Sequence, residues 1–273
     1  MTPDTLFSLK GKTALVTGGA TGIGRMAAEG MLAAGARVLI ASRKGDACAA
    51  AAAALNALGY AGQAEGFAGD VGDEAGVAAL AEAVQARTDR LHILMNNAGR
   101  SWGEPFGQFP YHAWDKVMSV NVAGVFHLTQ SLLPLLSSAA TDDDPARVVN
   151  VGSVMGEIPM GDGAYSYAAS KAAVHHITEI LAKELSASRI TVNALAPGPF
   201  VSNMTAFATA DAATRARVGD GVPLGRVGLP ADIAAAMMYL CGAGGAYVTG
   251  AILPISGGIN VTTGPSIFER ALS

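Results

Sequence analysis

The residues best suited to chemistry are a tyrosine and a lysine four positions apart. Tyr167 and Lys171 stand in a stretch with helical spacing, so both side chains are expected on one face of a helix. A free tyrosine titrates near ~10 and is a poor proton donor at neutral pH. A lysine ammonium within a few ångströms stabilises the phenolate and lowers that pKa, which makes the pair a usable general acid–base. Tyr165 is the obvious competitor, but Ala169 lies four residues after it.

Polar side chains follow two of the predicted strands. Ser153 comes just after a strand predicted at 148–151, fourteen residues before Tyr167. The sequence Asn-Asn-Ala-Gly at 96–99 ends another, and Asn121 lies in the next helical stretch. The carboxyl ends of parallel strands are where doubly wound folds bind ligands, so we expect these groups to meet at one edge.

A glycine-rich turn follows the first predicted strand. Residues 17–24 read Thr-Gly-Gly-Ala-Thr-Gly-Ile-Gly and open directly into a helical stretch. Glycines permit a tight turn, and the free N–H groups of the helix that follows bind a pyrophosphate. Taken alone, such a turn can be purely structural, but a strand before it and a helix after it are the context that dinucleotide binding requires.

The end of the second strand indicates the type of dinucleotide. An acid there binds the ribose of NAD, whereas an arginine accepts the 2′-phosphate of NADP. The chain has Ser42-Arg43-Lys44 and no acid, and an arginine suits a phosphate better than a diol. We therefore expect NADP(H). The alternative is a solvated basic pair at a strand end.

Short apolar runs alternate with Ala-rich helical stretches along the whole chain. This pattern predicts one Rossmann-type α/β domain over 1–273, with a doubly wound sheet of seven mostly parallel strands flanked by helices. The predicted strands are 13–17, 37–41, 62–68, 92–96, 148–151, 190–195 and 251–255. The predicted helices include 24–34, 47–57, 74–87, 114–133, 167–185 and 231–240.

Composition excludes several classes of protein. Hydrophobic residues make up 51% of the 273 residues and charged residues 15%, which excludes a disordered chain. A net charge of −4 argues against a nucleic-acid partner. No apolar run approaches the ~18–20 residues of a membrane helix, so we expect a cytoplasmic protein without a membrane partner. The two cysteines and five histidines show no metal-ligand spacing, so no metal is expected and the histidines are interpreted as structural or surface residues.

Taken together, these motifs resemble the short-chain dehydrogenase/reductase family, from about Leu9 to Gly258. The matching motifs are Thr-Gly-x-x-x-Gly-Ile-Gly, Asp70-Val71, Asn-Asn-Ala-Gly, Asn121, Ser153, Tyr167-x-x-x-Lys171 and Pro197-Gly198. The interval from Ser153 to Tyr167 is one residue longer than is common in the family and resembles that of a β-ketoacyl reductase. Thr21 departs from the basic residue that many NADP-preferring members carry there, so the NADP prediction depends on Ser42, Arg43 and Lys44.

The resemblance implies a role for each matching residue. Tyr167 would donate the proton in ketone reduction, and Ser153 would hydrogen-bond the substrate carbonyl. Lys171 would hold the nicotinamide ribose and depress the Tyr167 pKa, and Asn121 would anchor a water. The residues expected around the cofactor are Gly18, Thr21, Gly22, Ile23, Gly24, Ser42, Arg43, Lys44, Asp70, Val71, Asn97, Ala98, Gly99, Tyr167, Lys171, Pro197, Gly198, Phe200 and Ser202.

A long segment at 199–229 interrupts the alternation and is expected to cover the substrate as a lid. The substrate pocket is expected to contain Ser153, Met155, Met160, Tyr167, Phe200, Met204 and Phe207. This mostly apolar set indicates an apolar organic ligand. The resemblance to a β-ketoacyl reductase implies that this ligand is a β-ketoacyl thioester or a medium-sized hydrophobic ketone. A thioester would favour a basic rim, for which Arg100, Arg215, Arg217 and Arg226 are candidates.

The leading hypothesis is thus an NADPH-dependent carbonyl reductase. One alternative is a secondary-alcohol or steroid-type dehydrogenase running oxidatively. Another is a non-catalytic NADP-binding sensor, in which loss of Tyr167, Lys171 or Ser153 would be expected, and none is lost. The helices at 114–133 and 168–181 are apolar over most of their circumference, which predicts a subunit interface. The resemblance likewise implies a homodimer or homotetramer.

Overall fold

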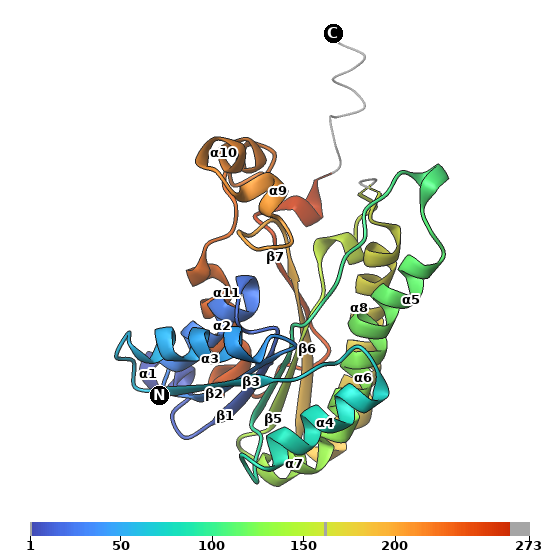
Figure 1. The fold of residues 1–273 in the computed structure, drawn as a ribbon. Coiled ribbons are helices and arrows are strands. Elements are labelled where there is room, and N and C mark those ends of the chain that lie inside the picture. Colours follow the sequence, from blue (N-terminus) through green and yellow to red (C-terminus); the bar gives the residue numbers. More distant parts are fainter. Residues whose placement is uncertain (1, 161–162, 263–273) are drawn as a thin grey trace.

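The computed structural model describes residues 2–160 and 163–262. At its centre is a seven-stranded sheet in which all neighbouring strands run parallel, in the order β3-β2-β1-β4-β5-β6-β7 (Figure 1). The strands are β1 (Thr13–Thr17), β2 (Arg37–Ser42), β3 (Gln63–Ala68), β4 (Ile93–Asn96), β5 (Ala146–Val151), β6 (Ile190–Pro197) and β7 (Ile252–Ile255). The predicted Rossmann-type doubly wound sheet is confirmed, and every predicted strand is present.

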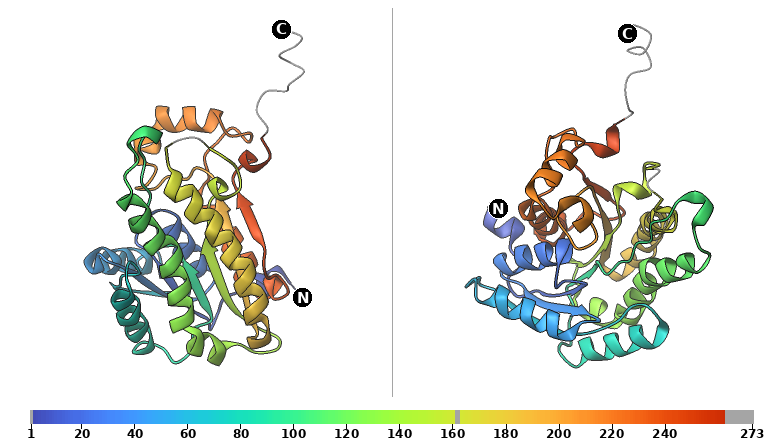
Figure 2. Two further views of the ribbon diagram at one scale, coloured as in Figure 1. Left: turned by 90° about the vertical axis from the view of Figure 1, so that its right-hand side faces the viewer. Right: turned by 45° about the horizontal axis from the view of Figure 1, so that its top comes forward.

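Helices cover both faces of this sheet (Figures 1 and 2). One face carries α2 (Gly22–Ala33), α3 (Gly45–Asn56) and α11 (Pro230–Cys241), and the other α4 (Glu74–Gln85), α6 (Gly124–Ser131) and α8 (Tyr165–Leu185). Because both faces are covered, every residue of β4, β5 and β6 is buried, which explains why these strands read as continuous apolar runs. The two edge strands, β3 and β7, are more open.

The carboxyl edge of the sheet carries the motifs. The strand order reverses direction between β1 and β4, which is where doubly wound sheets bind ligands. Above this edge in Figure 1 stand the short helices α9 (Ala206–Thr209) and α10 (Ala212–Asp220). Across from them rises the connection at 101–111, which includes the turn η1 (Phe106–Gln108).

The segment at 199–229 is closed at its base. The N–H of Gly228 donates to the carbonyl of Pro199 at 2.9 Å, and Phe200 pairs with Gly228 in an isolated β-bridge. The segment therefore leaves and rejoins the domain at one point, with α9 and α10 between.

The predicted helix at 114–133 is wrong as a single element. The chain there forms α5 (His112–Met118), a π turn η2 (Ser119–Ala123), α6, and α7 (Leu133–Ala139). A proline in the first turn of α7 lacks the N–H that a continuous helix would need, so α6 ends at Ser131. The remaining elements are α1 (Pro3–Phe7) and the turns η3 (Val154–Gly156), η4 (Ser186–Ser188), η5 (Ala243–Gly245) and η6 (Ile259–Val261).

Within the described residues, no single helix has the length and hydropathy to cross a membrane. Only the bent pair His112–Ser131 and Leu133–Ala139 meets that criterion, when its two parts are combined. Across residues 2–160 and 163–262, no group of three or more His, Cys, Asp or Glu side chains is arranged to hold a metal ion.

Candidate active site

Tyr167 and Lys171 lie one turn apart on α8, on the side of that helix that faces the end of β5. The Lys171 side chain is buried, and its Nζ donates a hydrogen bond to the carbonyl of Val151 at 2.6 Å. The same nitrogen lies 5.5 Å from the centroid of the Tyr167 ring. The i, i+4 spacing therefore brings the ammonium close to both the phenol ring and the end of β5.

Ser153 stands at the carboxyl end of β5, where the chain turns into η3. It is 6% exposed, and its Oγ accepts the N–H of Met155 at 3.2 Å, which caps that turn. The N–H of Gly152 donates to the carbonyl of Leu195 in β6 at 2.8 Å. The bond from Met155 to the Ser153 hydroxyl and the bond from Gly152 to Leu195 thus fix the turn that carries the serine.

Burial dominates the electrostatics of the pair on α8. It raises the pKa of Tyr167 above its ordinary value, and a hydrogen bond from Ser153 acts against that rise. Burial also lowers the pKa of Lys171 to about 8. Burial disfavours the phenolate because that form loses its water, and Lys171 is not among the causes of this shift, so the expected depression of the Tyr167 pKa by Lys171 stays a prediction. A raised pKa keeps the phenol protonated, as a proton donor requires.

Asn121 is fully enclosed within the π turn η2. Its Oδ1 accepts the N–H of Arg100 at 2.8 Å, and its Nδ2 donates to the Arg100 carbonyl and to Ser170 Oγ, both at 2.9 Å. Asn121 thus ties the connection after β4 to α8. The water that the family resemblance implies at this amide stays a prediction.

The glycine-rich turn has the backbone that its sequence predicts. Gly18 and Gly22 have φ of +65° and +55°, a region that favours glycine. A Cβ on Gly24 would lie 2.5 Å from Asn97 Nδ2, so this glycine permits close packing. The N-cap residue of α2, Thr21, makes no side-chain capping bond, which leaves the first N–H groups of the helix open to an anion.

Asn97 joins the ends of β1 and β4. Its Nδ2 donates to the carbonyls of Thr17 and Gly18 at 2.8 and 3.2 Å. The Thr17 Oγ1 in turn accepts the N–H groups of Asn97 and Ala98, each at 3.0 Å. The asparagine side chain therefore positions the glycine-rich turn.

One cleft of about 680 Å³ connects these groups. All the predicted cofactor residues line it except Gly24, and so do three of the predicted catalytic residues, Ser153, Tyr167 and Lys171. Asn121 is buried behind it. Two further lining residues, Arg100 and Met204, were predicted for the basic rim and the substrate pocket. The lining residues to which the sequence analysis gave no role are Thr17, Ala20, Ala41, Ala47, Gly69, Leu80, Ser101, Val120, Val151, Gly152, Asn203 and Thr205. Most are small or apolar and carry no chemical signal of their own.

Arg43 and Lys44 stand at the far end of the cleft and are exposed. Among the ion pairs of the described residues, neither side chain takes part. The Ser42 hydroxyl accepts the N–H of Lys44 at 3.3 Å and lies 3.0 Å from Cys48 Sγ. Asp70 Oδ1 accepts the N–H groups of Val71 and Gly72 at 2.8 and 3.0 Å, which fixes the loop after β3.

Residues 12–213 match the family described as short chain dehydrogenase. The chain belongs to that family. It is 46% identical over 255 residues to the "Rhamnolipids biosynthesis 3-oxoacyl-[acyl-carrier-protein] reductase" of Pseudomonas aeruginosa, covering 93% of this chain and 98% of that one. It is also 33% identical to the 3-oxoacyl-[acyl-carrier-protein] reductase FabG of Aquifex aeolicus, covering 93% and 99%. The predicted oxidoreductase class is confirmed, as is the likeness to a β-ketoacyl reductase.

Solved structures of short-chain dehydrogenases have the same fold. The Pseudomonas aeruginosa RhlG/NADP active-site complex has a TM-score of 0.89 at 47% identity, with 94% of this chain and 99% of that chain covered. A gluconate 5-dehydrogenase from Burkholderia cenocepacia in complex with NADP and tartrate has a TM-score of 0.85 at 30% identity, with 96% and 100% covered.

The structure brings only some of the residues of the predicted substrate pocket together at the cleft. Ser153, Tyr167, Phe200 and Met204 line the cleft, whereas Met155, Met160 and Phe207 do not. Met160 is 39% exposed and Phe207 88% exposed. Phe200 is 2% exposed and belongs mainly to the core, where its ring fills the space that a Cβ on Gly228 would occupy.

Aromatic side chains pack together across from α9 and α10, outside the cleft. Tyr165, at the start of α8, packs edge-on against Phe106 and Phe109, with centroid distances of 5.7 and 5.3 Å. The N–H of Glu104 donates to the carbonyl of Gly163 at 3.2 Å, which holds the 101–111 connection against the loop before α8. Tyr165 thus packs outside the cleft, whereas Tyr167 lines it. These positions agree with the choice of Tyr167 from its spacing to Lys171.

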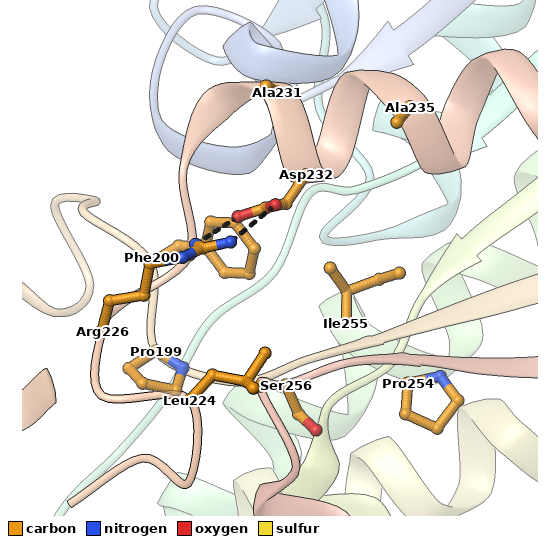
Figure 3. A pocket seen from close by; sticks show the side chains of 12 residues that line it. Pro199, Phe200, Leu224, Arg226, Ala231, Asp232, Ala235, Pro254, Ile255 and Ser256 are labelled. Carbon is orange, nitrogen blue, oxygen red and sulfur yellow. Dashed lines mark hydrogen bonds and ion pairs between the residues drawn. The ribbon is translucent and has the colours of Figure 1, made fainter. Parts of the chain in front are cut away.

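A second pocket of about 370 Å³ lies behind the base of the segment at 199–229 (Figure 3). Phe200 separates it from the catalytic cleft, and Arg226 and Asp232 form a two-pronged ion pair on its wall at 2.7 and 3.1 Å. None of the predicted catalytic residues lines this pocket. Because Arg226 is paired here, it does not serve the rim of the catalytic cleft, where Arg100 is the remaining lining candidate.

Proposed function

We propose that this protein is an NADPH-dependent reductase that converts the keto group of a 3-oxoacyl thioester to a secondary alcohol. One observation carries the proposal. Ser153, Tyr167 and Lys171 meet at one end of a cleft that continues past the glycine-rich turn to Arg43 at the other end. A donor set for a carbonyl and a cation for a 2′-phosphate thus share one continuous site.

The residues present fit a dinucleotide phosphate. The uncapped start of α2 offers N–H groups to a pyrophosphate, and the positive φ of Gly18 and Gly22 shapes the turn around it. Arg43, with Ser42 and Lys44 beside it, would hold the 2′-phosphate as a charged fork. When bound, the nicotinamide supplies the hydride for the reduction.

The protein's own groups supply the rest of the chemistry. The Ser153 hydroxyl hydrogen-bonds the substrate carbonyl and polarises it. The protonated phenol of Tyr167 donates its proton to the oxygen as negative charge develops there. The buried ammonium of Lys171 then favours the phenolate that remains, and Asn121 holds α8 against the connection after β4.

The walls of the cleft support an acyl substrate. Met204 and Phe200 from the segment at 199–229 line it. The side chains of Phe106 in η1 and of Phe207 in α9 are exposed, and both elements lie above the carboxyl edge of the sheet. An apolar chain gains free energy on such surfaces, at about 25 cal/mol per Å² removed from water. The segment at 199–229 acts as a lid in this proposal. The names of the two reductases similar to this chain agree with the same substrate class.

The assembly and location also belong to the proposal. Phe126 on α6 and Ile180 on α8 are 38% and 46% exposed, although both are large apolar side chains. A homodimer or homotetramer that buries these helices would remove them from water. We further propose that the protein acts in the cytoplasm.

The test compares kcat/KM for a 3-oxoacyl thioester with that for the matching free ketone and a cyclic ketone, with NADPH and with NADH. The proposal expects the thioester with NADPH to be preferred. A preference for the cyclic ketone would contradict the acyl substrate but retain the reductase. Faster oxidation of secondary alcohols at neutral pH would favour a dehydrogenase, and NADPH binding without turnover on any carbonyl would favour a sensor.

A further inference from the structure

We propose that His175 is a positioning residue of the reaction, whose neutral imidazole holds the backbone of Ser153 in place. This inference rests on the proposed function, because it concerns the serine that is to bind the substrate carbonyl. The sequence analysis interpreted the histidines as structural or surface residues. The structure places this one against the catalytic turn.

His175 contacts the turn directly. It lies on α8 one turn after Lys171, it is 8% exposed, and its Nε2 accepts the N–H of Ser153 at 3.4 Å. The ring fills the space next to Gly152, where a Cβ would lie 2.1 Å from Nε2. A second glycine, Gly156, has its missing Cβ 2.9 Å from the ring Cε1. Gly152 thus lacks a Cβ because this ring is packed against it, whereas a Cβ on Gly156 would first meet the backbone of α8 at Lys171, at 2.8 Å.

Lys171 and His175 act as a pair on the same backbone. Lys171 Nζ donates to the carbonyl of Val151, and His175 Nε2 accepts the N–H of Ser153, so the two side chains hold groups on either side of Gly152. Tyr167 precedes Lys171 by one turn on the same helix. Residues 167, 171 and 175 therefore form one stripe that sets the proton donor, the ammonium and the serine backbone relative to one another.

Accepting a hydrogen bond at Nε2 requires a neutral ring with its proton on Nδ1. That nitrogen lies 3.9 Å from Glu157 Oε1, on the loop after η3. The other charged groups facing the ring are Lys171 and Glu179, both on α8. Burial, followed by the charge of Lys171, lowers the pKa of His175 below its ordinary 6.5, with Glu179 acting in the other direction. The ring is therefore neutral at neutral pH.

Acidification should release the serine backbone. A protonated ring presents an N–H to the N–H of Ser153, so the bond is lost and the charged ring shifts toward Glu157. Tyr167 and Lys171 keep their protons as the pH falls, so neither gives an acidic loss of activity in the reductive direction. An acidic limb in kcat, with its midpoint below 6.5, is the signature of His175.

The experiment compares His175→Leu and His175→Gln with the wild type and with His176→Leu, using NADPH and a 3-oxoacyl thioester. His176 is the exposed neighbour, with 76% of its side chain open, and serves as the matched control. We expect His175→Leu to lower kcat by about ten- to hundredfold, the scale for a misplaced reacting group, with little change in the NADPH Kd. His175→Gln, which retains an acceptor without titrating, should recover most of kcat and lose the acidic limb.

An acidic limb that persists unchanged in His175→Gln would overturn the proposal and assign the titration to Glu157. Wild-type kcat in a folded His175→Leu would overturn it as well. If His175→Leu does not fold, the pH profile of His175→Gln decides alone. Failure of the proposed function is separate, because it would appear in the wild type as a preference for another carbonyl substrate or as NADPH binding without turnover, whatever the His175 variants do.

Discussion

The Lys171 Nζ donates to the main-chain carbonyl of Val151 at 2.6 Å, so the ammonium that we propose for the reaction also anchors the end of β5. The bond explains how a buried lysine keeps its charge near neutral pH, where burial alone lowers its pKa to about 8. It also makes the geometry of the site depend on the protonation of that lysine.

The reductive kcat/KM should therefore fall as the pH rises through about 8, the pKa of Lys171, because the neutral amine no longer supports the phenolate of Tyr167. Lys171→Met should be slow at every pH and lack this basic limb. Steady-state rates from pH 6 to pH 10, with the pH stability of the protein checked, provide the measurement. A flat profile in the wild type would contradict the assignment.

Lys171 also makes unfolding depend on pH. Its pKa is about 8 in the folded chain and 10.5 in the unfolded one, so the unfolded chain binds more protons between these values. The contribution of this group to the free energy of unfolding therefore rises with pH from about 8 to 10.5. Chemical denaturation of the wild type and of Lys171→Met should show a smaller rise in the variant; equal slopes would count against a buried ammonium.

Replacing Arg43 by glutamine should weaken NADPH binding selectively. The loss expected for one hydrogen bond to a charged group is about 1.5–3 kcal/mol, or roughly ten- to hundredfold in Kd, with NADH affinity almost unchanged. Arg90→Gln removes the same charge at the amino end of β4 and is the control. Calorimetric titration with both dinucleotides decides, and a parallel loss of NADPH and NADH affinity would exclude a 2′-phosphate contact.

The close packing of Phe200 on Gly228, at the base of the segment at 199–229, can be tested by adding a methyl group. A Cβ on Gly228 would lie 2.2 Å from the Phe200 ring, so Gly228→Ala should cost about 1–3 kcal/mol of stability through overpacking. Because Phe200 lies between the two pockets, kcat/KM should fall as well. Gly221→Ala is the control, since its nearest contact is 3.5 Å away at a negative φ. Identical melting temperatures in the two variants would contradict the close packing.

The sheet and the pairing of Tyr167 with Lys171 could be predicted because their signals are local. Buried parallel strands read as apolar runs, and the side chains of Tyr167 and Lys171 share a face wherever a helix forms. The glycine turn is likewise set by backbone that only glycine adopts readily, as at Gly18 and Gly22.

Other features depend on contacts between distant segments. Periodicity predicts one helix over 114–133 and gives no sign of the π turn that carries Asn121. Met155 lies in η3 and Phe207 in α9, and elements of three or four residues are too short to show a periodic pattern, so the place of these side chains relative to the cleft could not be derived. His175 shows no motif, and its role follows only from the approach of α8 to Gly152, although its position one turn after Lys171 was a usable signal.

The most direct test of the account is the rate of thioester-dependent NADPH oxidation by Tyr167→Phe, with Tyr165→Phe as the matched control. Tyr167→Phe should keep the fold and the NADPH Kd while kcat falls by about 10²–10⁴, the usual range for one positioned proton donor. Tyr165→Phe removes only a hydroxyl from a ring packed against Phe106 and Phe109, so its kcat should be unchanged. Wild-type turnover in Tyr167→Phe together with a loss in Tyr165→Phe would contradict the assignment of the proton donor.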